Sequence, residues 1–505
     1  MPAGMTIQQP VTTMARARFF RLGAAAILLS AVAVALTASA PPGRQPPSRR
    51  LSAGAATSNI TPPLGELIVG NWTPVPATHV HDELHARCLV LDDGETRVAI
   101  VVADNVGIPR RVLDEAKRLT QKQTGIPVDR ILIASTHTHS ATTARGSERE
   151  DATEPLDRYQ TFLAGRIADG IRRAINNLEP ARIGWGRGSL PEQVFNRRWF
   201  MKPGPHLNNP FGGADKVRMN PPVDSPDLLK PAGPTDPAIA FLSVQSDAGR
   251  PIALLANYSL HYVGGVPNGH VSADYFGVFA RKIAQLVDGG ADDDRDRRAR
   301  PFVAMLSNGT SGDVNNIDVR GGQKRLPDYA RMELVANQVT AEVFRVMQSI
   351  EYHDSVPLKM VQRELALETR RPTPKLIEWA RGILARPEGV TSEFPRERIY
   401  AERTLRMADM PARIEVPLQA LRIGDLAVVT IPFEVFAEMG LELKARSPFQ
   451  RTFVMSLANG AYGYLPTAAQ HELGGYETWL GTNQVEIEAA TKIVTTLLQM
   501  LRDLR

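Results

Sequence analysis

The chain has 505 residues, of which 43% are hydrophobic and 22% are charged, and its formal net charge is +5. These values exclude a largely disordered chain and predict a sizeable core, in one large domain or in several smaller ones. Six arginines and no acidic residue lie in residues 1–50, so the rest of the chain has a net charge of about −1. A folded part without a basic excess excludes a nucleic-acid-binding protein.

The first segment has the pattern of a secretory signal peptide. A basic stretch is followed by an apolar run from about Leu22 to Leu36 and by the small residues ASA at 38–40. The run is short for a membrane-spanning helix, so we predict export with cleavage of residues 1–40 and place the protein in the periplasm, outside the cell or at the cell surface. The alternative is an uncleaved membrane anchor. Residues 41–52 are predicted to be a disordered linker.

Residues 53–505 are predicted to form one large catalytic domain of the α/β class, with mixed β-sheets flanked by helices. The evidence is the alternation of strand-like and helix-like segments. In chain order, these are a hairpin over 86–107 with its turn at Asp92–Gly94, a helix over 110–125, a strand over 130–135, a helix over 159–178, strands over 239–246, 251–261 and 302–307, a hairpin over 418–434 and a helix over 483–504.

Two further segments are predicted to lie outside this regular framework. Residues 201–236 are rich in proline, glycine and asparagine, which indicates a long surface excursion. Residues 370–410 are rich in arginine, glutamate and proline around one helical core, LIEWARGIL, and are predicted to be an insertion or a lid. Cys88 is the only cysteine, so no intrachain disulfide can form.

Four predicted strands run directly into a histidine or an acidic residue. The stretches are RILIASTHTH, IALLANYSLH, FVAMLSNGTSGD and LAVVTIPFE. In open α/β sheets, ligands bind beyond the carboxyl ends of the strands, so we expect one site at these strand ends. A catalytic zinc takes about three protein ligands and keeps one position open. His137, His261 and Glu434 would supply such a set.

The spacing of the histidines alone leaves alternatives open. His137 and His139 share one face if they end a strand, and both, one or neither of them binds a metal. His79 and His81 have the same H-x-H spacing, with His85 close by, as at the first strand of barrel amidohydrolases. A barrel amidohydrolase would also require a metal-bridging lysine or its equivalent and a late strand-end aspartate, and the chain offers no convincing set of these residues.

Several motifs in order resemble the neutral/alkaline non-lysosomal ceramidases, which are zinc-dependent amidases that cleave the N-acyl bond of ceramide. The motifs are ASTHTHSA, ANYSLH followed by VSADYFG, SNGTSGDVNN, and ANGAYGYLPTAAQHELGGYE. The resemblance covers roughly residues 53–490 and implies the catalytic domain of that family. It also implies that the family's additional immunoglobulin-like C-terminal domain is missing, since the chain stops at Arg505.

The resemblance implies a ligand set for one zinc ion. His137, the first histidine of THTHS, His261 in YSLH and Glu434 in IPFE match three of the family's ligands, and Tyr464 in AYGY matches its tyrosine ligand. His139 would lie beside the metal as a catalytic or substrate-contacting group.

The resemblance also implies roles for two further residues and excludes the competing histidines from the metal site. Tyr476, twelve residues after Tyr464, matches the family's second catalytic tyrosine. Arg197 in FNRR matches its substrate-contacting arginine. His81 and His85 fall where the family has a plain strand, which implies structural or surface roles.

One position departs from the family pattern. The family's loop reads GDVSPN and its serine acts as a nucleophile or contacts the substrate, whereas this chain reads GDVNNI, with Asn315 at that position. An amide side chain is not a competent nucleophile. Ser311 lies four residues earlier, and its use instead would need a large loop shift.

These features predict an exported zinc hydrolase that cleaves an N-acyl amide bond, in a ceramide-like lipid or a related amide, by zinc-activated water. His139 would carry the proton to the leaving nitrogen, while Tyr476, Arg197 and Asn315 would stabilise the oxyanion. The alternative is a catalytically silent relative that keeps zinc and binds a lipid or glycan. The expected partner is a lipid or small-molecule amide, with peripheral membrane contact. Nothing in the sequence specifies an oligomeric state.

Overall fold

The computed structural model describes residues 50–505 except 71, 143, 145–154, 288–299, 388, 390 and 391. The predicted signal peptide and nearly all of the predicted linker therefore lie outside the described residues. Within the described part of the chain, no helix combines the length and the apolar character that a membrane span requires.

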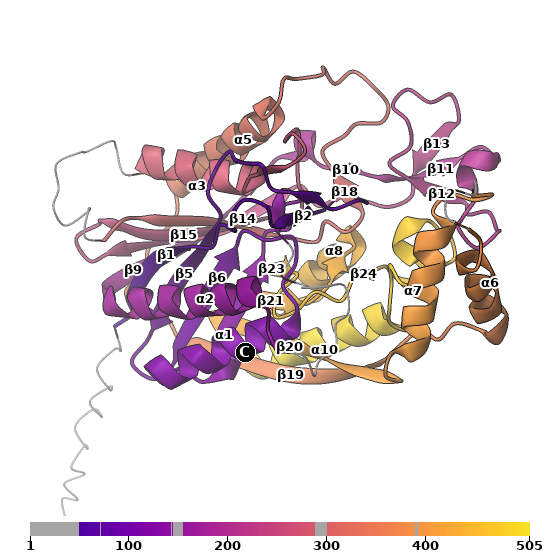
Figure 1. Ribbon diagram of the computed structural model, residues 1–505. Coiled ribbons are helices and arrows are strands. Elements are labelled where there is room, and N and C mark those ends of the chain that lie inside the picture. Colours follow the sequence, from indigo (N-terminus) through magenta and orange to yellow (C-terminus); the bar gives the residue numbers. More distant parts are fainter. Residues whose placement is uncertain are drawn as a thin grey trace, which may run out of the picture. The chain divides into compact units, whose positions relative to one another are not determined.

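The largest sheet has eight strands in the order β17-β15-β14-β9-β1-β5-β6-β7 (Figure 1). Most neighbours are antiparallel, but the outer pairs at both edges, β15 with β17 and β6 with β7, are parallel. The strands are β1 (Ser52–Asn59), β5 (His85–Asp92), β6 (Arg97–Ala103), β7 (Ile131–Ser135), β9 (Glu179–Ser189), β14 (Ala238–Ser246), β15 (Pro251–Tyr258) and β17 (Val303–Asn308).

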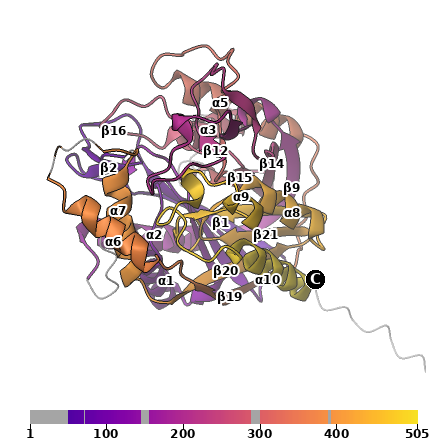
Figure 2. The same ribbon diagram turned by 90° about the vertical axis from the view of Figure 1, so that its right-hand side faces the viewer.

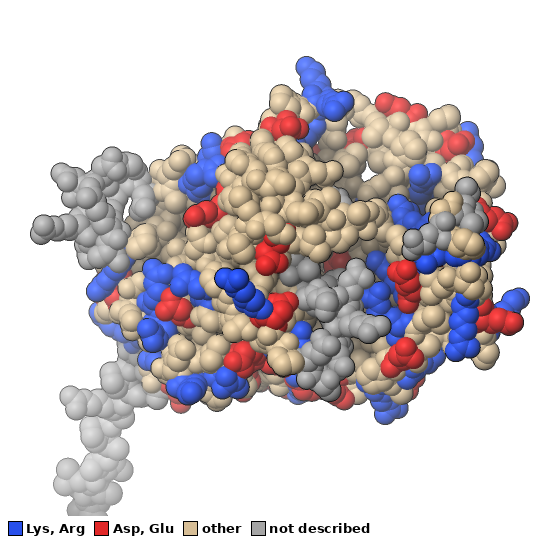
Figure 3. Space-filling model, viewed as in Figure 1, with Lys and Arg blue, Asp and Glu red and all other residues tan. Residues whose placement is uncertain are grey.

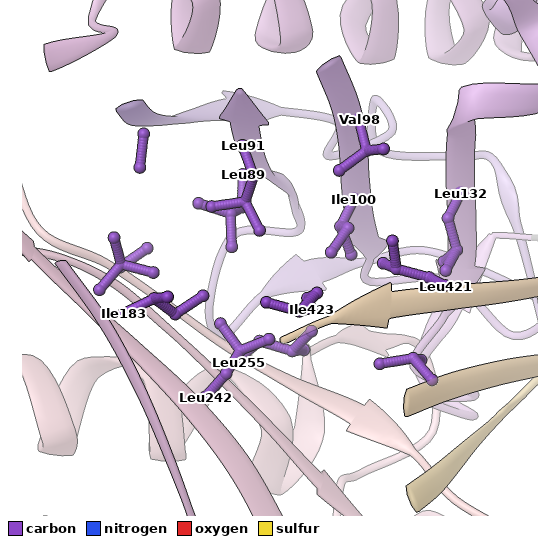
Figure 4. Close-up of a cluster of buried hydrophobic side chains, with 14 of the residues drawn as sticks. Leu89, Leu91, Val98, Ile100, Leu132, Ile183, Leu242, Leu255, Leu421 and Ile423 are labelled. Carbon is purple, nitrogen blue, oxygen red and sulfur yellow. The ribbon is translucent and has the colours of Figure 1, made fainter. Parts of the chain in front are cut away.

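A second sheet of four strands, in the order β19-β20-β21-β23, packs against the inner face of the first. Its strands are β19 (Leu358–Glu368), β20 (Arg413–Ile423), β21 (Leu426–Ile431) and β23 (Arg451–Ser456). The core between the two sheets consists of fully buried aliphatic side chains from nearly every strand. Figure 4 shows Leu89, Ile100 and Leu255 of the first sheet facing Leu421 and Ile423 of the second.

Helices cover the outer faces of both sheets (Figures 1 and 2). One pair packs on the β5–β7 half of the large sheet, a second pair on the β14–β17 half, and a third pair on the small sheet. In that order the pairs are α1 (Arg110–Thr124) with α2 (Arg158–Asn176), α3 (Asp274–Val287) with α5 (Ala330–Met347), and α8 (Ala437–Arg446) with α10 (Ala489–Leu504).

Strand β23 brings the two distant edges of the large sheet together. On one side, Nδ2 of Asn257 in β15 donates to the carbonyl of Val454 in β23, at 3.0 Å. On the other side, the segment after β23 lines the free edge of β7: the N–H of Asn459 donates to the carbonyl of Ile133 at 2.8 Å, and the N–H of Ile133 donates back to Asn459 Oδ1 at 3.3 Å. The carboxyl ends of β7 and β15 therefore meet although five strands of the large sheet separate them.

Short strands hold the loops above these carboxyl ends. They form four small sheets, β3-β2-β8, β16-β4, β10-β18 and β22-β24, while β12-β11-β13 forms a fifth within the segment 198–231. Their bounds are β2 (Leu67–Val69), β3 (Val75–Pro76), β4 (His79–Val80), β8 (Ala141–Thr142), β10 (Phe195–Asn196), β11 (Arg198–Met201), β12 (Val217–Met219), β13 (Leu228–Pro231), β16 (His270–Val271), β18 (Val314–Asn315), β22 (Glu434–Val435) and β24 (Tyr464–Leu465).

The predicted fold class, mixed α/β with helices on both sides, is confirmed, and so are most of the predicted elements. Three details differ. The excursion at 201–236 contains parts of the small sheet β12-β11-β13. The segment 370–410 contains two helices, α6 (Pro374–Leu384) and α7 (Glu397–Asp409), although only the first was predicted. The last helix begins at Ala489 rather than at 483.

Candidate metal centre

His137 and His139 lie beyond the end of β7, which stops at Ser135. His137 adopts a left-handed backbone conformation, with φ at 71°, and its N–H donates to the carbonyl of Asn105. A left-handed residue other than glycine costs about 1–2 kcal/mol, and such strain is common at functional sites. The two imidazoles therefore converge because of this turn, and the alternation of side chains along a strand plays no part.

Three histidines each donate from Nδ1 to a backbone carbonyl. His137 donates to Val106, His139 donates to Gly70 at 2.8 Å, and His261 donates to Ser311 at 3.0 Å. A carbonyl oxygen can only accept, so each Nδ1 carries the proton and each Nε2 keeps a free lone pair. This is the arrangement found for histidines that bind a metal through Nε2.

The three Nε2 atoms converge on one point. His137 Nε2 lies 3.0 Å from His261 Nε2 and 3.1 Å from His139 Nε2. His137 and His261 are buried, while His139 is partly accessible and has the ring of Tyr262 stacked on it at 3.7 Å. Among the described residues these three histidines are the one group whose spacing fits a metal ion.

The carboxylate of Glu434 completes the convergence. Strand β22 carries Glu434 to this point, and its Oε2 lies 3.2 Å from His137 Nε2 and 3.7 Å from His261 Nε2. Oε2 is buried and accepts no hydrogen bond from the described residues. Burial alone would raise the pKa of Glu434, but the neighbouring His137 and further polar groups lower it overall, so the carboxylate is ionised.

Four electron-pair donors thus face one another with no proton between them. Such a cluster is repulsive until a cation is placed at its centre, because a buried unpaired acceptor is costly. The separations also fit a tetrahedral zinc site, whose ligands lie roughly 3.4 Å apart when the metal–ligand distances are about 2.0–2.1 Å. Burial above all, together with the neighbouring imidazole of His137 and the positive charge of Arg197, lowers the pKa of His261 well below its ordinary value, which keeps its Nε2 available to a metal. The residues present therefore fit a metal ion.

Tyr464 lies beside Glu434, because β24 pairs with β22 and places the two residues opposite each other. Its hydroxyl donates to Glu434 and accepts from Nη2 of Arg197 at 3.0 Å. Burial raises the pKa of Tyr464 well above its usual value, whereas Arg197 opposes that shift. The structure thus places Tyr464 beside the cluster formed by the three histidines and Glu434.

Arg197 is held by a buried ion-pair network. Its Nε donates to Glu477 Oε1 at 3.1 Å, and Arg198 Nη1 donates to Glu477 Oε2 at 2.6 Å. All three side chains are almost fully buried. Two guanidinium groups share one carboxylate, so a positive charge remains next to Tyr464 and Glu434. Burial lowers the pKa of Arg197, but Tyr464 and Glu477 outweigh it and the net shift is upward.

Tyr476 continues this row of residues towards the surface. Its ring lies edge-on against Tyr464, with the centroids 5.5 Å apart, and edge-on against Trp72, at 5.4 Å. Burial raises the pKa of Tyr476, so its hydroxyl stays protonated and can donate a hydrogen bond. It lies close enough to the ligand cluster for the charge of Glu434 to contribute to that shift.

Asn315 and Ser311 lie around this cluster in different ways. Nδ2 of Asn315 donates to Asn220 Oδ1 at 2.7 Å, and its Oδ1 accepts from the N–H of Ile317, which leaves one N–H of the amide for a further partner. Ser311 Oγ donates to Asn308 at 2.8 Å and lies 3.5 Å from Nδ1 of His261. Because Nδ1 is the far side of that ring from the convergent Nε2, Ser311 lies behind the ligand and cannot replace the missing serine.

The second group of histidines lies elsewhere and is held differently. The ring of His81 stacks on Tyr329 at 3.7 Å, and the ring of His79 lies 4.7 Å from that of His270. His79 and His81 are exposed, and they lie on or next to the short strand β4 of an open sheet. Within the described residues they belong to no group spaced for a metal, so the structure gives no support to the barrel amidohydrolase reading.

Three residues near the cluster were not predicted: Glu477, Tyr262 and Trp72. Glu477 directly follows Tyr476, and the tandem Arg197-Arg198, buried at the junction of β10 and β11, is the signal that could have predicted a carboxylate partner. Tyr262 directly follows His261. Trp72 has no comparable signal, because its contact with Tyr476 joins segments about 400 residues apart in the sequence.

A cavity in the described part of the chain lies to one side of this cluster. It has a volume of about 590 Å³ and is lined by residues that include Phe211, Arg370 and Trp479. None of the candidate metal ligands lines it. Trp479 separates it from Tyr476, whose ring centroid is 6.0 Å away. The candidate metal centre therefore lies at the convergent side chains and not in this cavity.

Gly312 allows Glu434 to approach the loop after β17. A Cβ atom at this glycine would lie 2.5 Å from the carbonyl oxygen of Glu434. We expect Gly312→Ala to displace Glu434, to destabilise the protein by about 1–3 kcal/mol and to weaken metal binding. Thermal unfolding and metal titration measure both effects. Gly165→Ala, in α2 with open space around it, is the control and should keep full affinity; equal affinity in both variants would contradict the expectation.

Comparisons with known proteins identify the family and the fold. The family model described as neutral/alkaline non-lysosomal ceramidase, N-terminal, matches residues 52–324, more than half of the chain. The fold is similar to that of the neutral ceramidase from Pseudomonas aeruginosa, with a TM-score of 0.66 and 16% identity over 90% of this chain and 74% of the other. A structure of a ceramidase complexed with C2 gives a TM-score of 0.65 and 16% identity, over 90% and 75% of the two chains.

Proposed function

Since this chain belongs to the neutral/alkaline non-lysosomal ceramidase family, we propose that it is a zinc-dependent hydrolase of N-acyl amide bonds, acting on a ceramide-like lipid or a related amide. The observation that carries the proposal is the convergence of His137, His261 and Glu434, whose lone pairs face one point with no proton between them. Tyr464 adjoins them and would be the fourth ligand, through its hydroxyl oxygen. When bound there, zinc polarises the scissile carbonyl and lowers the pKa of a water molecule.

The charged and phenolic groups next to the cluster would serve the oxyanion that forms at the scissile carbonyl. The fixed positive charge of Arg197 lies beside Tyr464, and Glu477 holds its guanidinium in place. Tyr476 adds a hydroxyl that remains protonated. Donors that are already oriented in a site with little water stabilise a developing charge strongly, because nothing has to reorganise during the reaction.

His139 would carry the proton to the leaving nitrogen. It is the most accessible of the three histidines, its Nδ1 is fixed on Gly70, and Tyr262 holds the plane of its ring. A general acid–base of this kind contributes typically ~10²–10⁴-fold. Its Nε2 is also close enough to the other two histidines to serve as a ligand. The metal content of a His139 variant separates the two roles.

The second candidate function is that of a silent relative, which binds zinc and a lipid or glycan without turnover. Asn315 favours it, because an amide stands where the family has its serine and is tied to Asn220 and Ile317. Retention of Arg197 and Tyr476 beside the cluster favours the hydrolase, since a silent site does not need them.

A screen of N-acyl amides that includes ceramides, with and without a chelator, tests the proposed function. We expect release of the free amine from at least one amide, loss of turnover with the chelator and recovery with added zinc. A protein that retains zinc and hydrolyses none of the amides would be the silent relative. Two tightly bound metal ions per chain would contradict the single-zinc site.

Export also belongs to the proposal, because residues 1–40 have the pattern of a cleaved signal peptide. Fractionation of cells that produce the full chain tests it, and a product that keeps residues 1–40 in the cell interior would contradict it. The mixture of positive and negative side chains on the face shown in Figure 3 is consistent with the absence of a nucleic-acid partner.

A further inference from the structure

Trp72 marks the outer end of the row of aromatic residues that begins at the metal ligands. Tyr464, Tyr476 and Trp72 follow one another edge to face, with successive centroids 5.5 and 5.4 Å apart. Tyr464 contacts Glu434, while Trp72 is 41% exposed. A substrate whose amide reaches the ligand cluster therefore extends past Tyr476 towards Trp72.

Two arginines of the predicted lid lie over the ring of Trp72. The guanidinium carbon of Arg396 is 3.9 Å from the ring centroid, and that of Arg403 is 5.9 Å from it. Arg403 belongs to α7, and Arg396 is the residue before that helix. A third arginine, Arg218 of β12, lies near enough for its charge to act on Arg396. Three positive side chains from two separate segments thus gather beside Tyr476.

No carboxylate among the described residues neutralises this arginine cluster (Arg218, Arg396 and Arg403). Arg403 donates to the hydroxyls of Tyr400 and Thr482, at 3.2 and 3.1 Å, and both partners are uncharged. The side chains of Arg396 and Arg218 form no hydrogen bond or ion pair with any residue that the structure describes.

Some other arginines of the same region are paired with carboxylates, whereas Arg371 and Arg398 bond to backbone carbonyls. On α7 itself, Glu397 accepts from Arg386, and Glu477 neutralises the tandem Arg197-Arg198. Charges of one sign held close together repel each other, and an anion that binds among them relieves the repulsion. Guanidinium groups also match carboxylate, phosphate and sulfate oxygens with two parallel hydrogen bonds.

We propose that the substrate is an acidic N-acyl amide, which places a carboxylate, phosphate or sulfate group among Arg218, Arg396 and Arg403 while its amide lies at the metal ligands. The inference rests on the proposed function and narrows its substrate class, since a ceramide has no charge for this cluster to bind. Trp72 holds the planes of Arg396 and Arg403 by cation–π contact and leaves their N–H edges to the anion.

The test compares two amides that differ only in charge, N-octanoyl-8-aminooctanoic acid and its uncharged methyl ester, because a long methylene spacer is needed to carry the acid from the ligand cluster past Tyr476 to Trp72. We expect the wild-type protein to cleave the acid with a kcat/KM at least about tenfold higher than that for the ester, because a hydrogen bond to a charged group contributes a free energy of this size. In the double variant Arg218→Gln/Arg396→Gln, the ratio of kcat/KM for the acid to kcat/KM for the ester should fall towards one. The fall should come from a higher KM for the acid, and the zinc content should stay unchanged. Arg398→Gln, on the same helix and outside the cluster, is the matched control and should keep the preference.

Other outcomes would overturn the inference or separate it from the proposed function. Equal efficiency for the acid and the ester in the wild-type protein, or an equal loss for both in the double variant, would overturn it. If the variant loses only its sedimentation with phosphatidylglycerol vesicles and keeps its preference in solution, the cluster binds a membrane surface and the inference is wrong. Calorimetry that shows binding of the acid and not of the ester, without cleavage, would support the inference and reject the hydrolase.

Discussion

The variant His261→Ala is expected to lose the metal completely, so metal analysis should give about one zinc ion per wild-type chain and none for the variant. His261 is almost fully buried, and its Nε2 lies 3.0 Å from that of His137. Alanine removes one of the two imidazole ligands and leaves only His137 and Glu434, with Tyr464 beside them, to hold the ion. Turnover of any amide substrate should disappear with the metal, and added zinc should not restore it.

The control for this experiment is His206→Ala. His206 is not part of the ligand cluster. Among the residues that the structure describes, its ring bonds to the carbonyl of Lys202 and approaches Asp227. This variant should bind zinc as the wild-type protein does. Full zinc content in His261→Ala, in a folded protein, would show that His261 is not a ligand and would remove the main support for the proposed centre.

The second large effect is expected for His139→Ala, which should keep the zinc and lose about 10²–10⁴-fold in kcat. His137, His261 and Glu434 still supply three ligands in this variant, with Tyr464 beside them. The proton to the leaving nitrogen then has no carrier. Metal analysis and steady-state kinetics on the same preparation measure the two properties together.

Loss of zinc from His139→Ala would assign His139 as a ligand and take the proton-carrying role away from it. Its Nε2 lies 3.1 Å from that of His137, which is close enough for either role. Tyr262→Leu is a useful companion, because it removes the ring stacked on His139 without removing the imidazole. It should keep the zinc and lose less activity than the alanine variant.

Local patterns predicted the individual elements of the fold well. The two apolar runs of 86–103, separated by the turn at Asp92–Gly94, give the hairpin β5–β6, and the helical spacing of 110–124 gives α1, which ends at Gly125 in a left-handed conformation. The helix α7 was not predicted, because its sequence is polar and few of its side chains are buried. The meeting of opposite edges of the large sheet could not be predicted, since it depends on β23, which carries no site residue.

The candidate ligands were predictable because each follows a buried strand, whereas their roles came from the resemblance to a family. Sequence could not show that the left-handed turn at His137 brings His139 to the same point. Nor could it show the contacts of Glu477 or Trp72, which depend on side chains that meet only in the folded protein.

The closure of the large sheet by β23 also determines when in folding the metal can bind. His137 and His261 are separated by 124 residues and lie at opposite edges of that sheet, and Glu434 arrives with the second sheet. An unfolded chain therefore offers a cation no more than isolated local pairs such as His137 and His139. Contacts between distant segments form late, because loop closure costs entropy before they are made. A zinc ion bound at the proposed centre would therefore secure a nearly finished structure rather than nucleate it, and we expect a shortage of zinc to yield folded but empty protein.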